Sequence, residues 1–281
     1  MSIKIANLSH IYGQGSTFEK IALDNISIEI DTGEFVGIIG HTGSGKSTLV
    51  QHLNALLKPT SGEVFLNGEN IHEDKKKLKE IRSKVGLVFQ YPEHQLFEMT
   101  VFKDVAFGPT NMGLEKAEVD ERVRKALSLV GIAEESYEKS PFELSGGQKR
   151  RVAIAGVLAM QPSVLILDEP TAGLDPRGRD EILGQIKKMH DTLGITVILV
   201  SHSMEDIAKL VSKIFVIDHG KIATTGTPKE VFAQIELLEG IGLSSTQSAY
   251  IVRALQQRGF EVPDVYTVDD AVAVILKAVK G

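Results

Sequence analysis

The hydrophobic residues of the chain follow two different strand patterns. Over residues 3–30 apolar and polar residues alternate, and in "NISIEI" the side chains of Ile26, Ile28 and Ile30 fall on one face. Such alternation predicts antiparallel strands with one buried face. A second stretch of this kind, "GEVFLNGE" at 62–69, contains the Asn-Gly pair typical of a short hairpin. The sequence therefore predicts an antiparallel sheet in the N-terminal part of the chain.

Four further segments are almost continuously apolar, which is typical of parallel strands covered on both faces. They are "FVGII" at Phe35, "KVGLVF" at Lys84, "SVLILD" at Ser163 and "ITVILVS" at Ile195. Because helical patterns separate these segments, we expect an α/β fold with a parallel-sheet core and an antiparallel β subdomain.

Two parts of the chain have helical character. Between residues 97 and 160, "KAEVDERVRKALSLVGI" places its apolar residues on one stripe and predicts a helical insertion. After Pro228 the pattern gives three short helices, "KEVFAQIELLEGIGL", "SSTQSAYIVRALQQRGF" and "VDDAVAVILKAVKG". We expect a main domain over 1–227, with a helical subdomain at about 91–160, and a small helical extension over 228–281.

The composition narrows the classes of function. With 281 residues, of which 42% are hydrophobic and 24% charged, the chain can form a sizeable core. No apolar run approaches the roughly 18 residues of a membrane span, and the start lacks a secretory signal, so we expect a cytosolic protein. The absence of cysteine excludes disulfides and thiolate zinc sites. A formal net charge of −6 disfavours nucleic-acid binding through a broad basic face.

A glycine-rich loop, "GHTGSGKST", follows the first continuous apolar strand. It matches the phosphate-loop pattern G-x-x-x-x-G-K-[ST] between a strand and a helix. Its glycines let backbone N–H groups approach phosphate oxygens at the helix start. We expect Lys46 to neutralise the β and γ phosphates of ATP and Ser47 to bind Mg²⁺. The predicted nucleotide-binding residues here are Gly40, His41, Thr42, Gly43, Ser44, Gly45, Lys46, Ser47 and Thr48.

Two carboxylates end the strand "SVLILD". Asp168 and Glu169 are adjacent at its C-terminal end, and such a pair is unfavourable without a cation or a proton nearby. We assign Asp168 to Mg²⁺, through water, and Glu169 to the role of a general base that polarises the attacking water. A solvated loop with two acids is the alternative, and the phosphate loop upstream disfavours it.

Polar residues also follow the other two apolar strands. Gln90 ends "KVGLVF" and His202 follows "ITVILVS". Single Gln and His residues are usually structural, but ligands of open parallel sheets bind at the carboxyl edge, where all four strands would deliver a polar group. We therefore expect His202 to contact the γ-phosphate and Gln90 to sense the metal or the attacking water.

The stretch "ELSGGQKRR" predicts a second helix start suited to an anion. Ser145 and Gln148 form a capping box, yet capping does not require Gly146 and Gly147. Glycine is unfavourable by roughly 1 kcal/mol in a helix, and the three cations that follow lie at the unfavourable end of the helix dipole. An anion bound there would offset both effects. Because the phosphate loop already serves this chain's nucleotide, we expect a neighbouring subunit to bring its ATP to this helix start.

Taken in order, "GHTGSGKST", "VFQYPEHQ", "LSGGQKRR", "LILDEPTAGLD" and "ILVSHS" resemble the ATP-binding-cassette (ABC) ATPase family over nearly the whole of the first 230 residues. The resemblance implies a P-loop NTPase fold and a head-to-tail dimer, with each ATP between the phosphate loop of one subunit and the "LSGGQ" signature of the other. It further implies that Tyr12 stacks on adenine and that Asp175 communicates across the dimer.

More narrowly, "FQYPEHQLFEMTVFKDVAFGP" and the helical tail resemble the ATPase subunits of energy-coupling factor (ECF) transporters, and "GQGSTFEKIAL" resembles the second of their two ATPases. The resemblance implies import of vitamins or related micronutrients at the cytoplasmic face of the membrane. The implied partners are a paralogous ATPase, or a second copy of the chain, a transmembrane coupling subunit and a membrane substrate-binding subunit. We expect the tail to aid dimerisation and residues 91–97 to contact the coupling subunit.

Three alternatives remain open at this point. A soluble cassette ATPase, for example of the iron-sulfur assembly type, and an ATPase of a cobalt or nickel importer share the same motifs. A nucleotide kinase shares only the phosphate loop and leaves "LSGGQ" and the Asp168-Glu169 pair without a role.

Overall fold

The fold is built on a six-stranded sheet in which five neighbouring strands run parallel. The computed structural model describes the backbone of residues 3–280. In spatial order the strands are β10 (Lys221–Gly226), β9 (Lys213–Asp218), β3 (Phe35–Ile39), β8 (Thr196–Val200), β7 (Val164–Asp168) and β6 (Val85–Val88). Only β10, at one edge, is antiparallel to its neighbour.

Both faces of this sheet are buried, which confirms the prediction from the continuous apolar runs. In β3, Phe35 and Ile39 enter one hydrophobic core, whereas Val36 and Ile38 enter the other. The first core is shared with the helical region and with α6 (Pro176–Leu193) and α7 (Met204–Leu210). The second is shared with α1 (Lys46–Leu53) and the antiparallel sheet.

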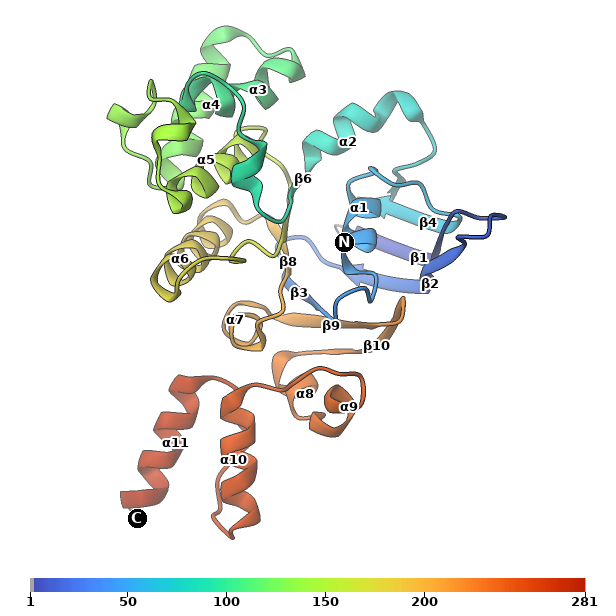
Figure 1. Cartoon of the computed structure of the whole chain (residues 1–281), viewed down its shortest axis with the longest axis vertical. Coiled ribbons are helices and arrows are strands. Elements are labelled where there is room, and N and C mark those ends of the chain that lie inside the picture. The colour runs from blue at the N-terminus through green and yellow to red at the C-terminus, as the bar shows by residue number, and fades with distance from the viewer. Residues whose placement is uncertain (1–2, 281) are drawn as a thin grey trace.

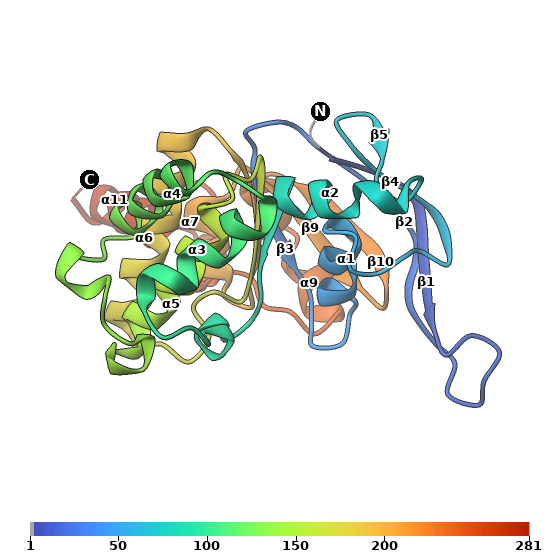
Figure 2. The ribbon, with the colours of Figure 1, turned by 90° about the horizontal axis from the view of Figure 1, so that it is seen from above.

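The predicted antiparallel sheet is present beside α1 (Figure 1). Its order is β2 (Lys20–Ile30), β1 (Ile3–Tyr12), β4 (Ser61–Leu66) and β5 (Glu69–Asn70). Asn67 and Gly68 both have positive φ angles, of 49° and 86°, and join β4 to β5, as the Asn-Gly signal predicts. The turn between β1 and β2 projects from the body of the molecule (Figure 2).

Helices dominate the middle of the chain. The principal ones are α2 (Leu78–Lys84), α3 (Val101–Met112), α4 (Lys116–Leu129) and α5 (Gly146–Leu158), with short 3₁₀ helices η1 (Lys75–Lys77), η2 (Pro92–Gln95), η3 (Glu134–Ser136) and η4 (Pro141–Glu143). In α4 the buried residues include Val119, Val123 and Leu127, which confirms the predicted apolar stripe. Helices α3, α4 and α5 pack on one another beside the core sheet (Figures 1 and 2).

The C-terminal tail contains α8 (Pro228–Phe232), α9 (Ile235–Gly240), α10 (Gln247–Gln257) and α11 (Val268–Lys280). The first predicted tail helix is thus two helices. The Ser245 hydroxyl donates a hydrogen bond of 2.8 Å to the carbonyl of Phe232, which a continuing helix would use itself. Val231, Phe232 and Leu238 enter the first core, so this core continues past residue 227.

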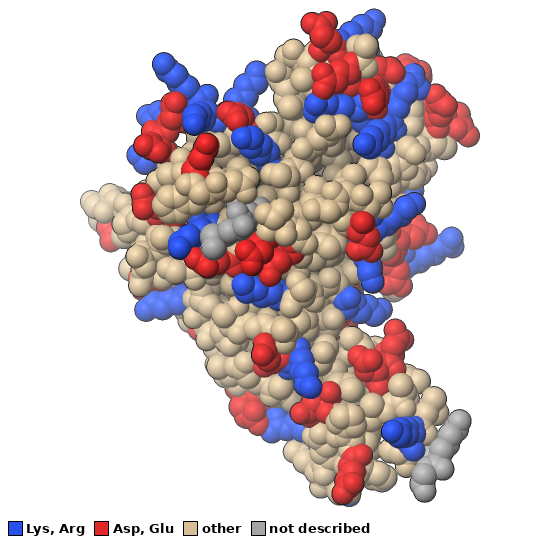
Figure 3. All heavy atoms as spheres, turned by 180° about the vertical axis from the view of Figure 1, so that it is seen from behind, with Lys and Arg blue, Asp and Glu red and all other residues tan. Residues whose placement is uncertain are grey.

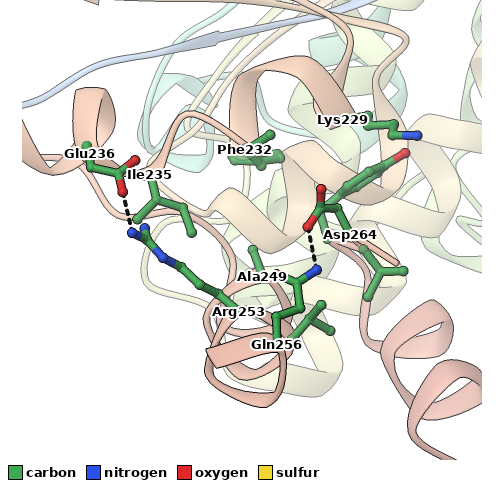
Figure 4. Close-up of a pocket in the computed structure, with 12 residues that line it drawn as sticks. Lys229, Phe232, Ile235, Glu236, Ala249, Arg253, Gln256 and Asp264 are labelled. Atoms are coloured by element: carbon green, nitrogen blue, oxygen red, sulfur yellow. Dashed lines mark hydrogen bonds and ion pairs between the residues drawn. The ribbon is translucent and has the colours of Figure 1, made fainter. Parts of the chain in front are cut away.

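Helices α8, α9 and α10 and residues 264–266 enclose a cavity of about 220 Å³ (Figure 4). Arg253 pairs with Glu236 across it, and Gln256 donates a 3.0 Å hydrogen bond to Asp264. These polar contacts fix α10 against α9 and the connection to α11.

Two strands were missing from the sequence prediction. "KIFVID" forms β9, and "KIATTG" forms the edge strand β10. The apolar residues 214–217 of β9 carry the same signal as the other parallel strands. In β10 exposed residues alternate with half-buried ones, as expected of a strand at the edge of the sheet.

Candidate functional site

The polar groups predicted after β3, β8 and β7 gather at one edge of the core sheet. These three strands are neighbours and parallel, so their carboxyl ends meet. The structure brings together Lys46 and Ser47 at the start of α1, Asp168 and Glu169 at the end of β7, and His202 after β8.

The loop between β3 and α1 is shaped by its glycines. A Cβ on Gly40 would lie 2.3 Å from the carbonyl oxygen of Ile217, so this glycine is required by close packing against β9. Gly45 caps α1 with a φ of 112°, which a larger residue rarely adopts. The loop is thereby held in one conformation at the start of α1.

Lys46 is buried and turns back on this loop. Its ammonium group donates hydrogen bonds to the carbonyl of Gly40, at 2.7 Å, and to that of His41, at 3.0 Å. Burial lowers the pKa of Lys46, while the nearby Glu169 and Asp168 act in the opposite direction. The loop carbonyls thus hold the cation where an anionic ligand would approach.

Asp168 ends β7 and is also buried. Burial raises the pKa of its carboxyl group, and the hydrogen bond from Ser47 and the charge of Lys46 counteract that rise. The carboxylate and the Ser47 hydroxyl together form an oxygen pair of the kind that a hard cation binds.

Glu169 has the most perturbed carboxyl group at this edge. Burial, and to a smaller extent the charge of Asp168, raise its pKa to about 7. Its Oε1 atom lies 3.2 Å from Nε2 of His202 without the geometry of a hydrogen bond, so this buried oxygen is unsatisfied. Burial and the charge of Lys46 lower the pKa of His202. A neutral imidazole beside a carboxyl group with a pKa near 7 suits proton transfer.

Two predicted residues lie at the margin of the site. Gln90 is exposed beyond β6, and its side chain makes no hydrogen bond within the described residues. Tyr12 ends β1 with 41% of its surface exposed, and its hydroxyl lies 3.2 Å from Oγ1 of Thr48. The ring of Tyr12 is therefore tied to α1, beside the phosphate loop.

The remaining residues of the loop have local contacts. Ser44 is fully buried, and its hydroxyl lacks a hydrogen-bond partner within the described residues. The ring of His41 contacts the carbonyl of Thr42 at 2.9 Å. Gly43 has a φ of 83° and open space around its Cα. A buried hydroxyl with no partner among the described residues is available to hydrogen-bond a ligand or water.

The second predicted helix start is present, with the full capping box. The Ser145 hydroxyl accepts a hydrogen bond from the Gln148 amide, and the Gln148 side chain accepts one from the Ser145 amide. A Cβ on Gly146 or Gly147 would meet nothing within 4 Å, so packing within the described chain does not explain these glycines. Helices α5 and α1 lie apart in both ribbon views (Figures 1 and 2).

Arg150, one of the three cations that follow this helix start, has an anionic partner within the chain. Its side chain is buried and forms two hydrogen bonds to the carboxylate of Glu93, at 2.9 and 2.6 Å. It also donates to the carbonyls of Pro170 and Ala172, directly after Glu169. Arg150 therefore has its anion within the chain and fixes the loop that carries Glu169. The two residues are 57 positions apart in the sequence, so no local sequence signal indicates this pair.

Asp175 also makes a structural contact within the chain. Its side chain caps α6 by accepting a 2.7 Å hydrogen bond from the amide of Gly178. The loop from Glu169 to Asp175 is thus held at both ends, by Arg150 and by this cap.

Comparisons with known proteins agree with this geometry. The sequence model of the ABC transporter family matches residues 23–172, more than half of the chain. The energy-coupling factor transporter ATP-binding protein EcfA2 of Caldanaerobacter subterraneus subsp. tengcongensis is 58% identical over 100% of this chain and 99% of its own length. EcfA2 of Clostridium perfringens is 55% identical, with the same coverage.

Solved structures give the same result. One is cbiO1 from Clostridium perfringens, described as part of the ABC transporter complex cbiONQ, with a TM-score of 0.77, 40% identity and coverage of 90% of this chain and 98% of that one. Another is the MJ0796 cassette, a dimer bound to ADP and Pi, with a TM-score of 0.72, 31% identity and coverage of 80% and 98%. The chain belongs to the ABC transporter family, among the ATP-binding proteins of energy-coupling factor transporters.

Proposed function

We propose that this chain binds ATP in a pocket that a second ATPase subunit completes, and that hydrolysis there drives the import of vitamins or related micronutrients. As a family member the chain is an ATPase that powers an energy-coupling factor importer. The observation that carries the proposed mechanism is the meeting of Lys46, Asp168, Glu169 and His202 at one sheet edge.

The phosphate loop binds the nucleotide phosphates through the amides of residues 40–48. Lys46 neutralises the β and γ phosphates, and Tyr12 stacks on adenine.

The oxygens of Ser47 and Asp168 fit Mg²⁺, and Gln90, which follows β6, is a further ligand. When bound, Mg²⁺ neutralises charge on the phosphates. The buried carboxylate and the unsatisfied hydroxyl of Ser44 support this assignment.

Glu169 acts as the general base. A carboxyl group with a pKa of about 7 accepts a proton efficiently near neutral pH. Its unsatisfied Oε1 is free to receive a hydrogen bond from the attacking water. His202 contacts the γ-phosphate and orients Glu169, while Arg150 keeps the following loop in place.

The start of α5 binds the ATP held by the other ATPase subunit, through Ser145, Gly146, Gly147 and Gln148. Asp175 communicates between the two subunits of the dimer. The open space at both glycines supports this arrangement, since a phosphate group can approach the first amides of α5. The second subunit is a paralogous ATPase, with a homodimer as the other possible composition.

The transmembrane coupling subunit contacts the helical region beside 91–97. A groove of about 840 Å³ lies there, and its lining includes Leu56, Phe89, Phe97, Phe107, Met112 and Met160. Phe97 and Phe107 are 58% and 49% exposed, and their rings meet edge to face. Such an exposed apolar groove fits an amphipathic helix of a membrane partner.

The chain acts as a peripheral protein at the cytoplasmic face of the membrane. Among the described residues, every helix is too short or too polar to cross a bilayer. A separate membrane subunit binds the transported substrate.

The C-terminal tail has an exposed apolar surface. It includes four residues that are each about half exposed: Ile251, Val268, Val272 and Leu276. This surface supports a role of the tail in dimerisation.

The similar EcfA2 proteins support an ECF transporter ATPase. They give no such support to a soluble cassette ATPase or to the ATPase of a metal-ion importer. A soluble ATPase that remodels a nucleic-acid complex would be expected to present a basic surface. On the face seen in Figure 3, basic and acidic side chains are interspersed.

The test uses the intact complex isolated from membranes. Lys46→Ala should abolish ATP binding at this chain's phosphate loop, whereas Glu169→Gln should strongly reduce turnover while the complex retains ATP. The measurements are radiolabelled ATP retention, ATPase activity and the subunits that copurify. Unchanged turnover in either variant would contradict the roles assigned to Lys46 and Glu169. Recovery of the wild-type chain without membrane subunits would contradict the proposal that it assembles with them.

A further inference from the structure

A second cluster of potential ligands joins the phosphate loop to the turn after β9. It consists of His41, Asp218 and His219, and one ligand atom from each lies within 4.8 Å of the other two. His41 Nε2 is 3.0 Å from Asp218 Oδ1, and His219 Nε2 is 3.7 Å from the same oxygen. The proposed hydrolysis mechanism assigns no role to Asp218 or His219.

We propose that these three residues bind a divalent transition-metal ion of the Zn²⁺ class, independently of Mg²⁺ and ATP. Two imidazoles and one carboxylate are ligands that Zn²⁺ prefers, and three protein ligands with one open position are typical of its non-structural sites. Mg²⁺ favours oxygen ligands and is a poor match for the two imidazoles.

The charges around the cluster suit a cation. Asp218 has only histidines as ion-pair partners among the described residues, so no lysine or arginine neutralises its carboxylate. The neighbouring Lys221 is paired with Asp24, at 3.1 Å, which reduces its repulsion of an incoming ion. The ligand atoms are already grouped, and only small side-chain rotations are needed to bring them to metal-bond distances.

The backbone positions of the ligands are fixed by two rigid segments. Asp218 ends β9, and the following turn is tied to the phosphate loop because the Gly220 amide donates a 2.9 Å hydrogen bond to the carbonyl of Ser44. The Gly220 carbonyl accepts another, of 2.8 Å, from Asp24. The His219 side chain is 84% exposed, so it can rotate onto the ion and leave the fourth position to water.

A bound ion would connect the phosphate loop to the β9–β10 turn. The residue it would hold, His41, is one of the two whose carbonyls accept hydrogen bonds from Lys46. Metal occupancy would therefore restrain the loop at a residue that accepts a hydrogen bond from the phosphate-binding lysine.

The experiment titrates Zn²⁺, and separately Co²⁺, into the full chain without nucleotide and without an affinity tag. Calorimetry should give one Zn²⁺ per chain, and Co²⁺ should give the visible absorption of a four- or five-coordinate site. His219→Gly removes one ligand while suiting the left-handed backbone there, where φ is 44°. This variant and His41→Ala should each weaken binding by at least about tenfold.

His94→Ala is the matched control, because His94 is an exposed histidine outside the cluster, and it should bind Zn²⁺ like the wild type. Circular dichroism of each variant establishes that it is folded. Equal Zn²⁺ affinity in the wild type, His219→Gly and His41→Ala, or no stoichiometric binding by the wild type, would overturn the proposal. In that case the His41–Asp218 contact is only a hydrogen bond that positions the loop.

Discussion

Glu169 combines an unusual backbone with an unusual side chain. Its φ is 51°, in the left-handed region that non-glycine residues seldom occupy, and its carboxyl group is buried with one unsatisfied oxygen. A left-handed backbone at a non-glycine residue destabilises the folded state, and such strain is found mainly at functional sites, where the surrounding structure holds it in place. Here the Glu169 amide is held by the carbonyl of Val200, and Arg150 holds the residues that follow.

The raised pKa of Glu169 predicts a pH-dependent stability. The unfolded chain loses the proton near pH 4.5, whereas the folded chain keeps it up to about pH 7. The folded state therefore binds more protons between these values, and the free energy of unfolding falls as the pH rises through that window. In Glu169→Gln this loss is absent, so without nucleotide the variant should gain stability over the wild type from about pH 4.5 to about pH 7.

Urea unfolding at pH values from 4.5 to 8 measures this difference. Glu121→Gln, in an exposed part of α4, is the control and should follow the wild type. A constant difference between Glu169→Gln and the wild type over the whole range would show that Glu169 is not buried as a protonated acid.

Arg150 is the residue whose loss should most affect stability near the site. Burial alone would raise the pKa of Glu93, but the hydrogen bond and charge of Arg150 hold it below its ordinary value. Arg150→Ala leaves that carboxylate and two carbonyls unpaired, so we expect the free energy of unfolding to fall by about 3–5 kcal/mol.

Denaturant unfolding of Arg150→Ala tests this expectation. Arg177→Ala is the matched control: Arg177 also pairs with a glutamate, but its side chain is 90% exposed, so its removal should change stability little. Similar stability of the two variants would refute the role given to the buried pair.

At the scale of the elements, the strength of each sequence signal decided what could be predicted. The four continuous apolar runs predict four parallel strands, and the shared direction of these strands predicts that Asp168, Glu169 and His202 lie at one edge of the sheet, as the structure has them. The break between α8 and α9 could not be predicted, because it depends on a hydrogen bond from Ser245 that only the folded tail provides.

The same contrast holds for the site. The phosphate loop and the capping box are local patterns, and both occur as local structures. The Arg150–Glu93 pair and the contact between Gly40 and β9 join residues far apart in the sequence, and periodicity and spacing contain no information about such contacts.

The start of α5 makes a prediction at the scale of one element. Gly146→Leu meets no steric obstacle within the chain, so the isolated subunit should bind ATP with nearly unchanged affinity. In the assembled complex the side chain would occupy the place of the partner's phosphate, and ATP turnover should fall by on the order of a hundredfold.

Nucleotide binding to the isolated chain and turnover of the complex are measured side by side. Gly184→Leu, at an equally open glycine in α6, is the control and should lower neither. Loss of ATP affinity in the isolated Gly146→Leu chain would contradict the shared pocket.

At the scale of the whole molecule, the core extends into the tail. Because Val231, Phe232 and Leu238 belong to the first core, a chain that ends at Thr227 should lose most of its stability and aggregate. A chain that ends at Leu243 keeps these core residues but lacks α10, α11 and Ser245, whose hydroxyl bonds to the Phe232 carbonyl. It should fold and bind ATP, yet dimerise more weakly than the full chain.

Light scattering after size exclusion, in ATP and in the Glu169→Gln background, measures this dimerisation. Full-length Glu169→Gln is the reference. Equal dimer fractions for the chain that ends at Leu243 and for the full chain would remove α10 and α11 from the dimer contact.

The shared pocket is the central claim, and a structure of the Glu169→Gln complex trapped with ATP tests it most directly. We expect the Ser145 hydroxyl and the Gly147 amide to lie about 3 Å from phosphate oxygens of the ATP held by the other ATPase subunit. ATP bound at Lys46 should in turn face the corresponding helix start of that subunit. A trapped dimer in which Ser145 faces solvent, remote from any nucleotide, would contradict the account.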